Sequence, residues 1–147
     1  MQGADQVTDN NDIPPLFMVV DDDQVVLAQA ESRLCDLGYQ VITREGKSYF
    51  DISDDILKYK PDVLLLDIRM PSMSGARLTE LLGRHDRTAN TPVILHSNVE
   101  PGELRELARK SGAMGVIPKT PDDQLFVSQL KRLMRRIDVV ENRRKAG

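Results

Sequence analysis

The sequence is poor in the residues that build several common kinds of site. Cys35 is the single cysteine and there are two histidines, so neither a disulfide framework nor a cysteine metal site can form within one chain. No apolar run approaches the roughly 20 residues that a membrane-spanning helix needs. A Gly-rich dinucleotide loop is missing after the first apolar run, which argues against a nicotinamide enzyme. We therefore predict a soluble, cytoplasmic protein without a membrane partner.

Length and composition limit how the chain is organised. With 147 residues and 40% hydrophobic content, it has room for one domain with an ordinary core. Residues 1–15 are polar and acidic and lack the basic start and apolar stretch of a secretory signal. We predict a disordered leader over residues 1–15, a folded domain over 16–138 and a basic C-terminal tail over 139–147.

Basic residues are concentrated toward the C-terminus. From Lys131 onward, seven Lys or Arg stand against two acidic residues, a local charge of +5 that leaves −8 for the rest of a chain of net charge −3. Such a segment can bind nucleic acid or an acidic partner, but a solvated helix face is the commoner explanation. We expect no direct binding to nucleic acid.

Short apolar runs predict the strands of a sheet. Four of them are typical of strands buried on both faces, namely Phe17–Val20, Val63–Leu66, Val93–Leu95 and Val116–Ile117. A fifth run, Tyr39–Thr43, follows Gly38 and is more polar, as expected of an edge strand.

Segments with helical spacing of apolar residues alternate with these runs. They cover Leu27 to Leu37 closed by Gly38, Phe50 to Tyr59, Gly75 to Leu82, and Pro101 to Lys110 before Gly112. A last helix is expected to open at Thr120 with a hydroxyl cap, a proline in the first turn and two carboxylates. Its apolar face holds Phe126, Leu130, Leu133, Met134 and Ile137. Regular alternation predicts an α/β fold with a parallel sheet covered on both faces.

Polar residues follow the ends of the predicted strands. Asp21 and Asp22 end the first run, Asp67 follows the third in chain order, Ser97 the fourth and Lys119 the fifth. The carboxyl ends of parallel strands share one edge, where open α/β sheets bind their ligands. Crowded carboxylates repel one another, and Mg²⁺, which prefers oxygen ligands, relieves that repulsion. We predict a Mg²⁺ site where Asp67 can attack a phosphoryl group.

These residues carry a resemblance that covers about Leu16 to Ile137. The matching stretches are Met18 to Asp23, Pro61 to Pro71 with Gly75, Pro92 to Ser97, and Gly112-Ala113 with Lys119. In this combination and order they resemble the receiver domain of two-component response regulators of the chemotaxis-regulator kind. The resemblance implies a flavodoxin-like fold of five parallel strands in the order 2-1-3-4-5 with five helices.

The resemblance also implies a role for each site residue. Asp67 is the phosphoacceptor, while Asp21 and Asp22, with the backbone carbonyl of Arg69, complete the Mg²⁺ ligands. Ser97 is the switch hydroxyl and Lys119 the phosphate-binding cation. Such a domain is a signalling module, not an enzyme, and it promotes only its own phosphorylation and dephosphorylation. The phosphoryl donor is a histidine kinase or a phosphotransfer protein.

Two positions depart from the family pattern. Val116 stands where most members have the aromatic residue of the switch, three places before the lysine, so the usual hydroxyl-to-aromatic relay is not expected. Lys119 is preceded by Pro118 and followed by Thr120, whereas the family lysine usually precedes a proline, often with a cis bond. A cis bond before Thr120 would cost about 2.5–4 kcal/mol. We predict a trans bond there, with Pro118 at a strand end.

Two other functions compete with phosphorylation. One is a receiver-like docking module that works without phosphate. The other is a phosphatase with an aspartate nucleophile, but such enzymes usually carry a second aspartate two residues on, where Arg69 stands here. Family members often dimerise or bind a downstream partner through the fourth and fifth helices. Lys131, Arg132, Arg135 and Arg136 would decorate that surface and favour an acidic partner.

The two histidines and the cysteine are not expected to be functional residues. His85 and His96 lack metal-ligand spacing, so we expect them to be solvated or locally hydrogen-bonded. Cys35 is expected to pack within its helix.

Overall fold

The computed structural model of the protein describes residues 13–146, with side chains described as far as Ile137. Most of the predicted leader therefore lies outside the described residues. The strands are β1 (Leu16–Val20), β2 (Gln40–Arg44), β3 (Val63–Leu66), β4 (Val93–Ser97) and β5 (Gly115–Pro118). The helices are α1 (Gln24–Asp36), α2 (Tyr49–Tyr59), α3 (Gly75–Gly83), α4 (Pro101–Ser111) and α5 (Asp123–Ala146).

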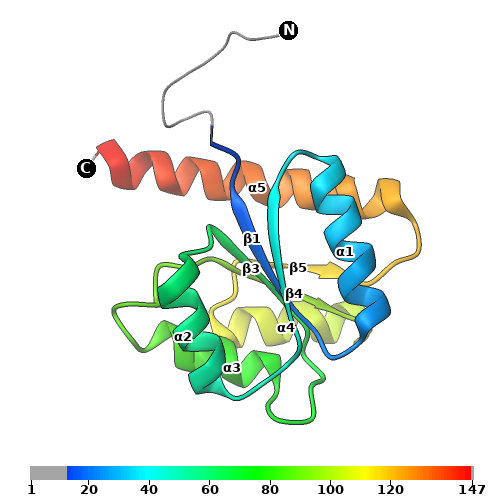
Figure 1. Ribbon diagram of the computed structural model, residues 1–147, viewed down its shortest axis with the longest axis horizontal. Coiled ribbons are helices and arrows are strands. Elements are labelled where there is room, and N and C mark those ends of the chain that lie inside the picture. Colours follow the sequence, from blue (N-terminus) through cyan, green and yellow to red (C-terminus); the bar gives the residue numbers. More distant parts are fainter. Residues whose placement is uncertain (1–12, 147) are drawn as a thin grey trace, which may run out of the picture.

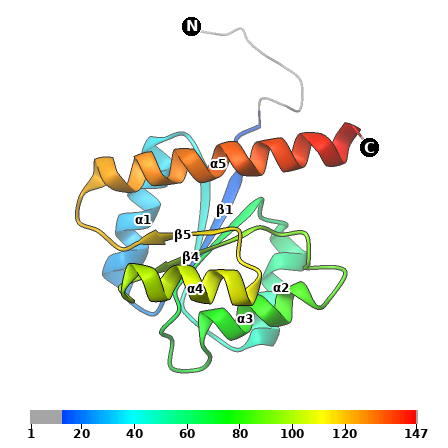
Figure 2. The same ribbon diagram turned by 180° about the vertical axis from the view of Figure 1, so that it is seen from behind.

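The five strands form one parallel sheet in the order β2-β1-β3-β4-β5, as predicted. This order makes β2 an edge strand, which explains its more polar sequence. The helices cover both faces: α1 and α5 lie on one side, and α2, α3 and α4 on the other (Figure 1; Figure 2, from behind). The predicted flavodoxin-like α/β architecture is confirmed.

Each face of the sheet buries its own apolar cluster. Under α1 and α5, side chains such as Leu34, Phe126 and Leu130 pack on the inward residues of β1 and β3 and are fully buried. The other cluster lies under α2, α3 and α4 and includes Ile52 and Leu78. All five residues predicted for the apolar face of the last helix are buried. Every residue of β3 is buried, as expected of a central strand of a parallel sheet.

Helix ends follow the predicted local signals except at α5. The carboxylate of Asp23 caps α1, accepting from the Val25 N–H at 2.9 Å. Gly112 ends α4 in the left-handed conformation, with φ of 87°.

Helix α5 begins at Asp123, later than its predicted opening, because Asp122 and not Thr120 is the cap. The Asp122 carboxylate accepts from the Gln124 and Leu125 N–H groups at 2.9 and 3.2 Å. The Thr120 carbonyl is already occupied by Arg33, at 2.8 Å. The helix then runs to Ala146, through most of the segment predicted as a basic tail. No helix in residues 13–146 is long and apolar enough to cross a bilayer.

Candidate functional site

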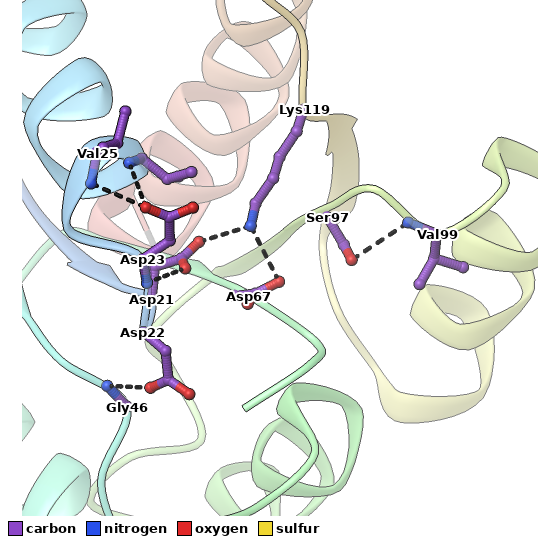
Figure 3. A network of polar contacts seen from close by, with 10 residues as sticks. Asp21, Asp22, Asp23, Val25, Gly46, Asp67, Ser97, Val99 and Lys119 are labelled. Carbon is purple, nitrogen blue, oxygen red and sulfur yellow. Dashed lines mark hydrogen bonds and ion pairs between the residues drawn. The ribbon is translucent and has the colours of Figure 1, made fainter. Parts of the chain in front are cut away.

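The carboxyl-terminal edge of the sheet gathers the polar residues that follow the strands. A pocket of about 210 Å³ there is lined by Asp21, Asp22, Asp23, Asp67, Arg69, Ser97, Asn98 and Lys119. These residues come from the ends of β1, β3, β4 and β5 and the loops that follow them, and the side chains of Asp21, Asp67 and Lys119 face one another (Figure 3). Sequence positions nearly 100 apart thus meet at one cavity, as a parallel sheet requires.

Backbone hydrogen bonds fix where the site residues leave the sheet. The Asp21 N–H donates to the Arg44 carbonyl at 3.1 Å, and the Asp67 N–H to the Val20 carbonyl at 3.0 Å. The Lys119 N–H donates to the Ser97 carbonyl at 3.0 Å. These bonds extend the strand ladders by one residue, so the side chains project from a rigid frame.

Lys119 joins two of the carboxylates. Its Nζ lies 2.9 Å from Asp21 Oδ2 and 3.4 Å from Asp67 Oδ1, and all three side chains are largely buried (Figure 3). An ammonium between two carboxylates offsets their mutual repulsion. Lys119 therefore points toward Asp67, although its loop departs from the family pattern. The Lys119–Thr120 bond is trans, as is every other described peptide bond, and Pro118 ends β5, both as predicted.

Asp67 is held in surroundings that disfavour its charge. Burial, and then the negative charge of Asp21, raise the pKa of the Asp67 carboxyl above its usual value. Lys119 and a hydrogen bond from the Arg69 backbone act against this shift without cancelling it. The charged form of Asp67 is thus a high-energy group, which any added cation would stabilise.

Asp22 turns away from Lys119 and toward the β2–α2 loop. Its Oδ1 accepts from the Gly46 N–H at 3.0 Å. A Cβ at Gly46 would lie 2.4 Å from Asp22 Oδ1 and 2.5 Å from Met70 Sδ, so both of these side-chain ends would have to shift to admit one. The other oxygen, Oδ2, is buried and has no hydrogen-bond partner among the described residues. A buried carboxylate oxygen without a donor costs free energy unless a cation or water reaches it.

The donor set at this edge fits Mg²⁺ chemically. It consists of oxygen atoms; Asp22 Oδ2 is buried without a hydrogen-bond partner among the described residues, while Asp21 Oδ2 is buried and paired with Lys119. Within residues 13–146, however, no three acidic, histidine or cysteine side chains already converge as a metal-ligand group. The reason is visible in Figure 3: Lys119 lies between Asp21 and Asp67, while Asp22 faces Gly46. The Arg69 carbonyl as a ligand stays a prediction.

Ser97 ends β4 at the rim of the pocket. Its side chain is 1% exposed, and its Oγ accepts from the Val99 N–H at 3.3 Å. This bond holds the hydroxyl toward the β4–α4 loop in Figure 3. Asn98, next in sequence, also lines the pocket and was not predicted as a site residue. Its position directly after Ser97 was the signal that could have identified it.

Comparison with known proteins decides the family. The model of the response regulator receiver domain matches residues 17–131 of this chain. The chain belongs to this family. It is 27% identical to the polar-differentiation response regulator DivK of Brucella anthropi over 81% of this chain and 95% of DivK. It is 31% identical to the transcriptional regulatory protein CpxR of Escherichia coli over 82% of this chain and 49% of CpxR.

Solved structures agree on the fold of this receiver domain. The chemotaxis response regulator CheY4 of Vibrio cholerae superposes with a TM-score of 0.72 at 22% identity, over 82% of this chain and 98% of CheY4. This chain spans about half the length of several curated relatives, CpxR among them. A receiver domain is a module of two-component signal transduction and typically not an enzyme, as the sequence predicted.

Val116 sits in the receiver domain as a packing residue. It lies on β5 opposite Leu95 of β4, and its partly buried side chain packs on the cluster under α2, α3 and α4. A valine side chain has no ring that could turn in or out. The β5 position of the usual aromatic residue is therefore filled by a fixed branched side chain.

The predictions for His96 and Cys35 were wrong. His96 is only 3% exposed, and its Nε2 has no hydrogen-bond partner in the part of the chain that the structure describes. It lies edge-on to the Phe126 ring, with centroids 5.8 Å apart, because β4 is buried on both faces. Cys35 is exposed, since α1 buries Leu34 and its turn-related neighbours and leaves Cys35 on the solvent side. His85 is exposed in a loop, as predicted.

Buried His96 makes the stability of the receiver domain depend on pH. Burial, and then the positive charges of Lys119 and Arg33, lower the pKa of His96 from 6.5 to about 3. Below about pH 6.5 the unfolded chain therefore takes up a proton that the folded protein refuses. We expect this residue alone to reduce the free energy of unfolding by about 3 kcal/mol on going down to about pH 4.

Urea denaturation across this pH range measures the effect. In a His96→Leu variant the free energy of unfolding should fall by about 3 kcal/mol less over this pH range, because leucine does not titrate. Parallel curves for the two proteins would show that His96 does not cause the decline.

Gly75 lets α3 approach the phosphoacceptor loop. A Cβ at this position would lie 2.0 Å from the Asp67 carbonyl oxygen and 2.8 Å from its carbonyl carbon. Both contacts are to backbone, so no side-chain rotation can relieve them. We expect Gly75→Ala to lower the free energy of unfolding by about 1–3 kcal/mol, measured by urea denaturation.

Gly83 is the matched control in the same helix. A Cβ at Gly83 has no atom within 4 Å. Gly83→Ala should therefore leave stability unchanged or raise it by up to about 1 kcal/mol. Equal stability of the two variants would contradict the close approach at Gly75.

Proposed function

We propose that this receiver domain accepts a phosphoryl group on Asp67 from a histidine kinase or phosphotransfer protein, in a reaction that requires Mg²⁺. The observation that carries the proposal is the position of Lys119 Nζ, 2.9 Å from Asp21 and 3.4 Å from Asp67, in a pocket that Ser97 also lines. An ammonium and a hydroxyl beside a buried carboxylate are the groups that phosphoryl transfer needs.

In the proposed reaction, an Asp67 carboxylate oxygen attacks the phosphorus of the donor. A new oxygen–phosphorus bond forms, and the bond between phosphorus and the donor breaks, leaving its electron pair on the departing group. Lys119 Nζ moves from Asp67 to the phosphoryl oxygens and neutralises their charge. Ser97 Oγ exchanges its bond with Val99 for one to the phosphoryl group, which shifts the β4–α4 loop.

Asp21, Asp22, Asp67 and the backbone carbonyl of Arg69 are the proposed Mg²⁺ ligands. Bound Mg²⁺ supplies positive charge to the phosphoryl oxygens and to the carboxylates. For its part, the protein supplies the buried Asp22 Oδ2, which has no hydrogen-bond partner among the described residues, and the Asp21 and Asp67 oxygens that Lys119 contacts.

Intact-mass measurement after incubation with acetyl phosphate tests the proposal. We expect a single phosphoryl adduct with Mg²⁺ present and none when the metal is removed with EDTA. An unlabelled wild-type protein at saturating Mg²⁺ and phosphodonor would refute the proposal.

A docking module that works without phosphate is the second candidate. It is favoured by Val116, which cannot act as an aromatic switch residue, and by Thr120 in place of the usual proline. In the cell, a docking module would keep its function after Asp67→Asn, whereas a phosphorylation-dependent receiver would lose it. The phosphatase alternative finds no support in the exposed Arg69, where such an enzyme would need a second aspartate. Turnover of a phosphorylated metabolite would revive it.

We propose the α4–α5 side as the surface for a second copy or a downstream partner. Four cations on α5 are exposed there, namely Lys131, Arg132, Arg135 and Arg136. They favour a partner with an acidic surface. Charge reversal at Arg135 and Arg136 is expected to weaken association with an acidic partner, measured in a pull-down. Unchanged association after reversal would exclude these residues from the interface.

A further inference from the structure

We propose that Arg33, on α1, is a positioning residue that holds the β5–α5 loop so that Lys119 faces Asp67. This inference rests on the proposed function, because its consequence is the rate of phosphoryl transfer to Asp67. In this chain no proline follows Lys119, so another device has to fix the loop. Arg33 lies far from this loop in the sequence, and the sequence analysis did not predict its role.

Arg33 contacts the loop at two points on either side of the turn. Its Nη2 donates to the carbonyl oxygen of Thr120 at 2.8 Å. Its Nε donates to Asp123 Oδ1 at 2.6 Å. Thr120 directly follows Lys119, and Asp123 is the first residue of α5. The planar guanidinium thus ties both ends of a short segment to α1.

The guanidinium itself is held in place by its surroundings. Its central carbon lies 5.0 Å from the centroid of the Phe126 ring, and the side chain is 5% exposed. Burial of a cation is costly unless its donors are satisfied, so Arg33 has little freedom to move away from its partners. The Asp123 side chain is 76% exposed, whereas Thr120 is only half-buried, so the Thr120 carbonyl is the less exposed partner.

The two anchors of the loop flank Lys119. On one side its own N–H donates to the Ser97 carbonyl at 3.0 Å. On the other side Arg33 fixes the Thr120 carbonyl, in the peptide group one residue beyond Lys119. With the backbone held on both sides, the Lys119 side chain points toward Asp21 and Asp67. Loss of the Arg33 anchor would let Lys119 move, and misplacement by about 1 Å can cost a hundredfold in rate.

A double-mutant cycle with Lys119 tests this role. We expect Arg33→Met to slow labelling by acetyl phosphate, at saturating Mg²⁺, by about tenfold to a hundredfold. In a Lys119→Met background, Arg33→Met should cause no further slowing, because it acts through Lys119. If the two substitutions slow labelling additively, Arg33 does not position Lys119.

Arg44 provides the matched control. It forms the same pair of contacts, with Asp55 Oδ2 3.0 Å from its Nε and its guanidinium 5.1 Å from the Tyr59 ring. Its side chain does not touch the β5–α5 loop. Arg44→Met should lower the unfolding midpoint without a comparable loss of labelling rate. Equal slowing in the two arginine variants would mean that general destabilisation explains the effect, and the inference would be lost.

Native-state amide exchange provides a readout that does not depend on phosphorylation. Arg33→Met should accelerate exchange at residues 119–123 and leave α4 unchanged. If the wild-type protein accepts no phosphoryl group, the proposed function is refuted. The exchange data would still decide whether Arg33 fixes the loop. Unchanged exchange in that segment would overturn the inference.

Asp123→Asn is the second variant, for the case in which Arg33→Met does not fold. It weakens one anchor at an exposed position and keeps the Thr120 bond. We expect a several-fold slowing of labelling that is again absent in the Lys119→Met background. A normal labelling rate combined with normal exchange at residues 119–123 would count against the role of Arg33.

Discussion

An Asp67→Asn variant is expected to form no phosphoryl adduct with acetyl phosphate and Mg²⁺. The side-chain amide of asparagine lacks the anionic oxygen that attacks phosphorus, while its size and position are nearly those of aspartate. Intact mass measures the result directly. An adduct of undiminished yield in the variant would place the phosphoryl group on another residue and remove Asp67 from its proposed role.

The same variant is expected to be more stable than the wild type when Mg²⁺ is absent. Burial and Asp21 raise the pKa of Asp67 in the folded protein. For an acid with a raised folded pKa, stability is lost as pH rises from the unfolded value, 3.8, through the folded one. Asparagine does not titrate, so the Asp67→Asn variant should have a higher unfolding midpoint at neutral pH than the wild type. Added Mg²⁺ should reduce the difference, and a variant less stable than wild type would contradict this balance of charges.

Replacing Lys119 by methionine is expected to have the second largest effect. Lys119 is the described cation nearest to Asp67, so its loss should slow labelling by roughly 10²–10³-fold, the usual cost of a missing charge-stabilising group. Lys110→Met is the control, since Lys110 is exposed on α4 and lies 3.8 Å from Glu106. Its labelling rate should be that of the wild type.

Lys119→Met should also bind Mg²⁺ more tightly, not less. Lys119 Nζ competes with a metal for Asp21 Oδ2 and Asp67 Oδ1, and without it the two carboxylates repel each other more strongly. Titration calorimetry measures the affinity. Slower labelling together with tighter Mg²⁺ binding would show that labelling is slow because the phosphate-binding cation is missing, and not because the metal is lost. Weaker Mg²⁺ binding would mean that Lys119 supports the metal site, against the present account.

Local patterns in the sequence were sufficient for most of the fold. The run Val63–Leu66 was assigned as β3 with correct bounds, because four consecutive apolar residues are tolerated where both faces of a strand are covered. The start of α5 was misplaced. Thr120 and Asp122 are both good caps, and both accept backbone N–H groups: the Thr120 hydroxyl accepts from Asp122 at 3.1 Å, and the Asp122 carboxylate accepts from the first turn of α5.

The candidate site, like the fold, was predicted from the sequence only in part. The positions of Asp21, Asp67, Ser97 and Lys119 at one edge followed from the strand order, since each residue directly follows or ends a strand. Their internal contacts did not follow from it. The turn of Asp22 toward Gly46 and the insertion of Lys119 between two carboxylates depend on distances between loops of different crossovers. The burial of His96 was missed because the predicted apolar run ended at Leu95, whereas β4 continues to Ser97 and is buried on both faces.

The sequence by itself determined the α/β alternation, the parallel sheet, and the edge at which acidic, hydroxyl and ammonium groups would meet, because spacing and capping act within a few residues along the chain. Only the tertiary structure decided the charge pattern of that edge: the raised pKa of Asp67, the ion pairs of Lys119, and the hold of Arg33 on its loop. These depend on burial and on contacts between residues distant in the sequence, such as Arg33 and Asp123, which are 90 positions apart. No local pattern records such contacts, since they form only when the helices pack on the sheet.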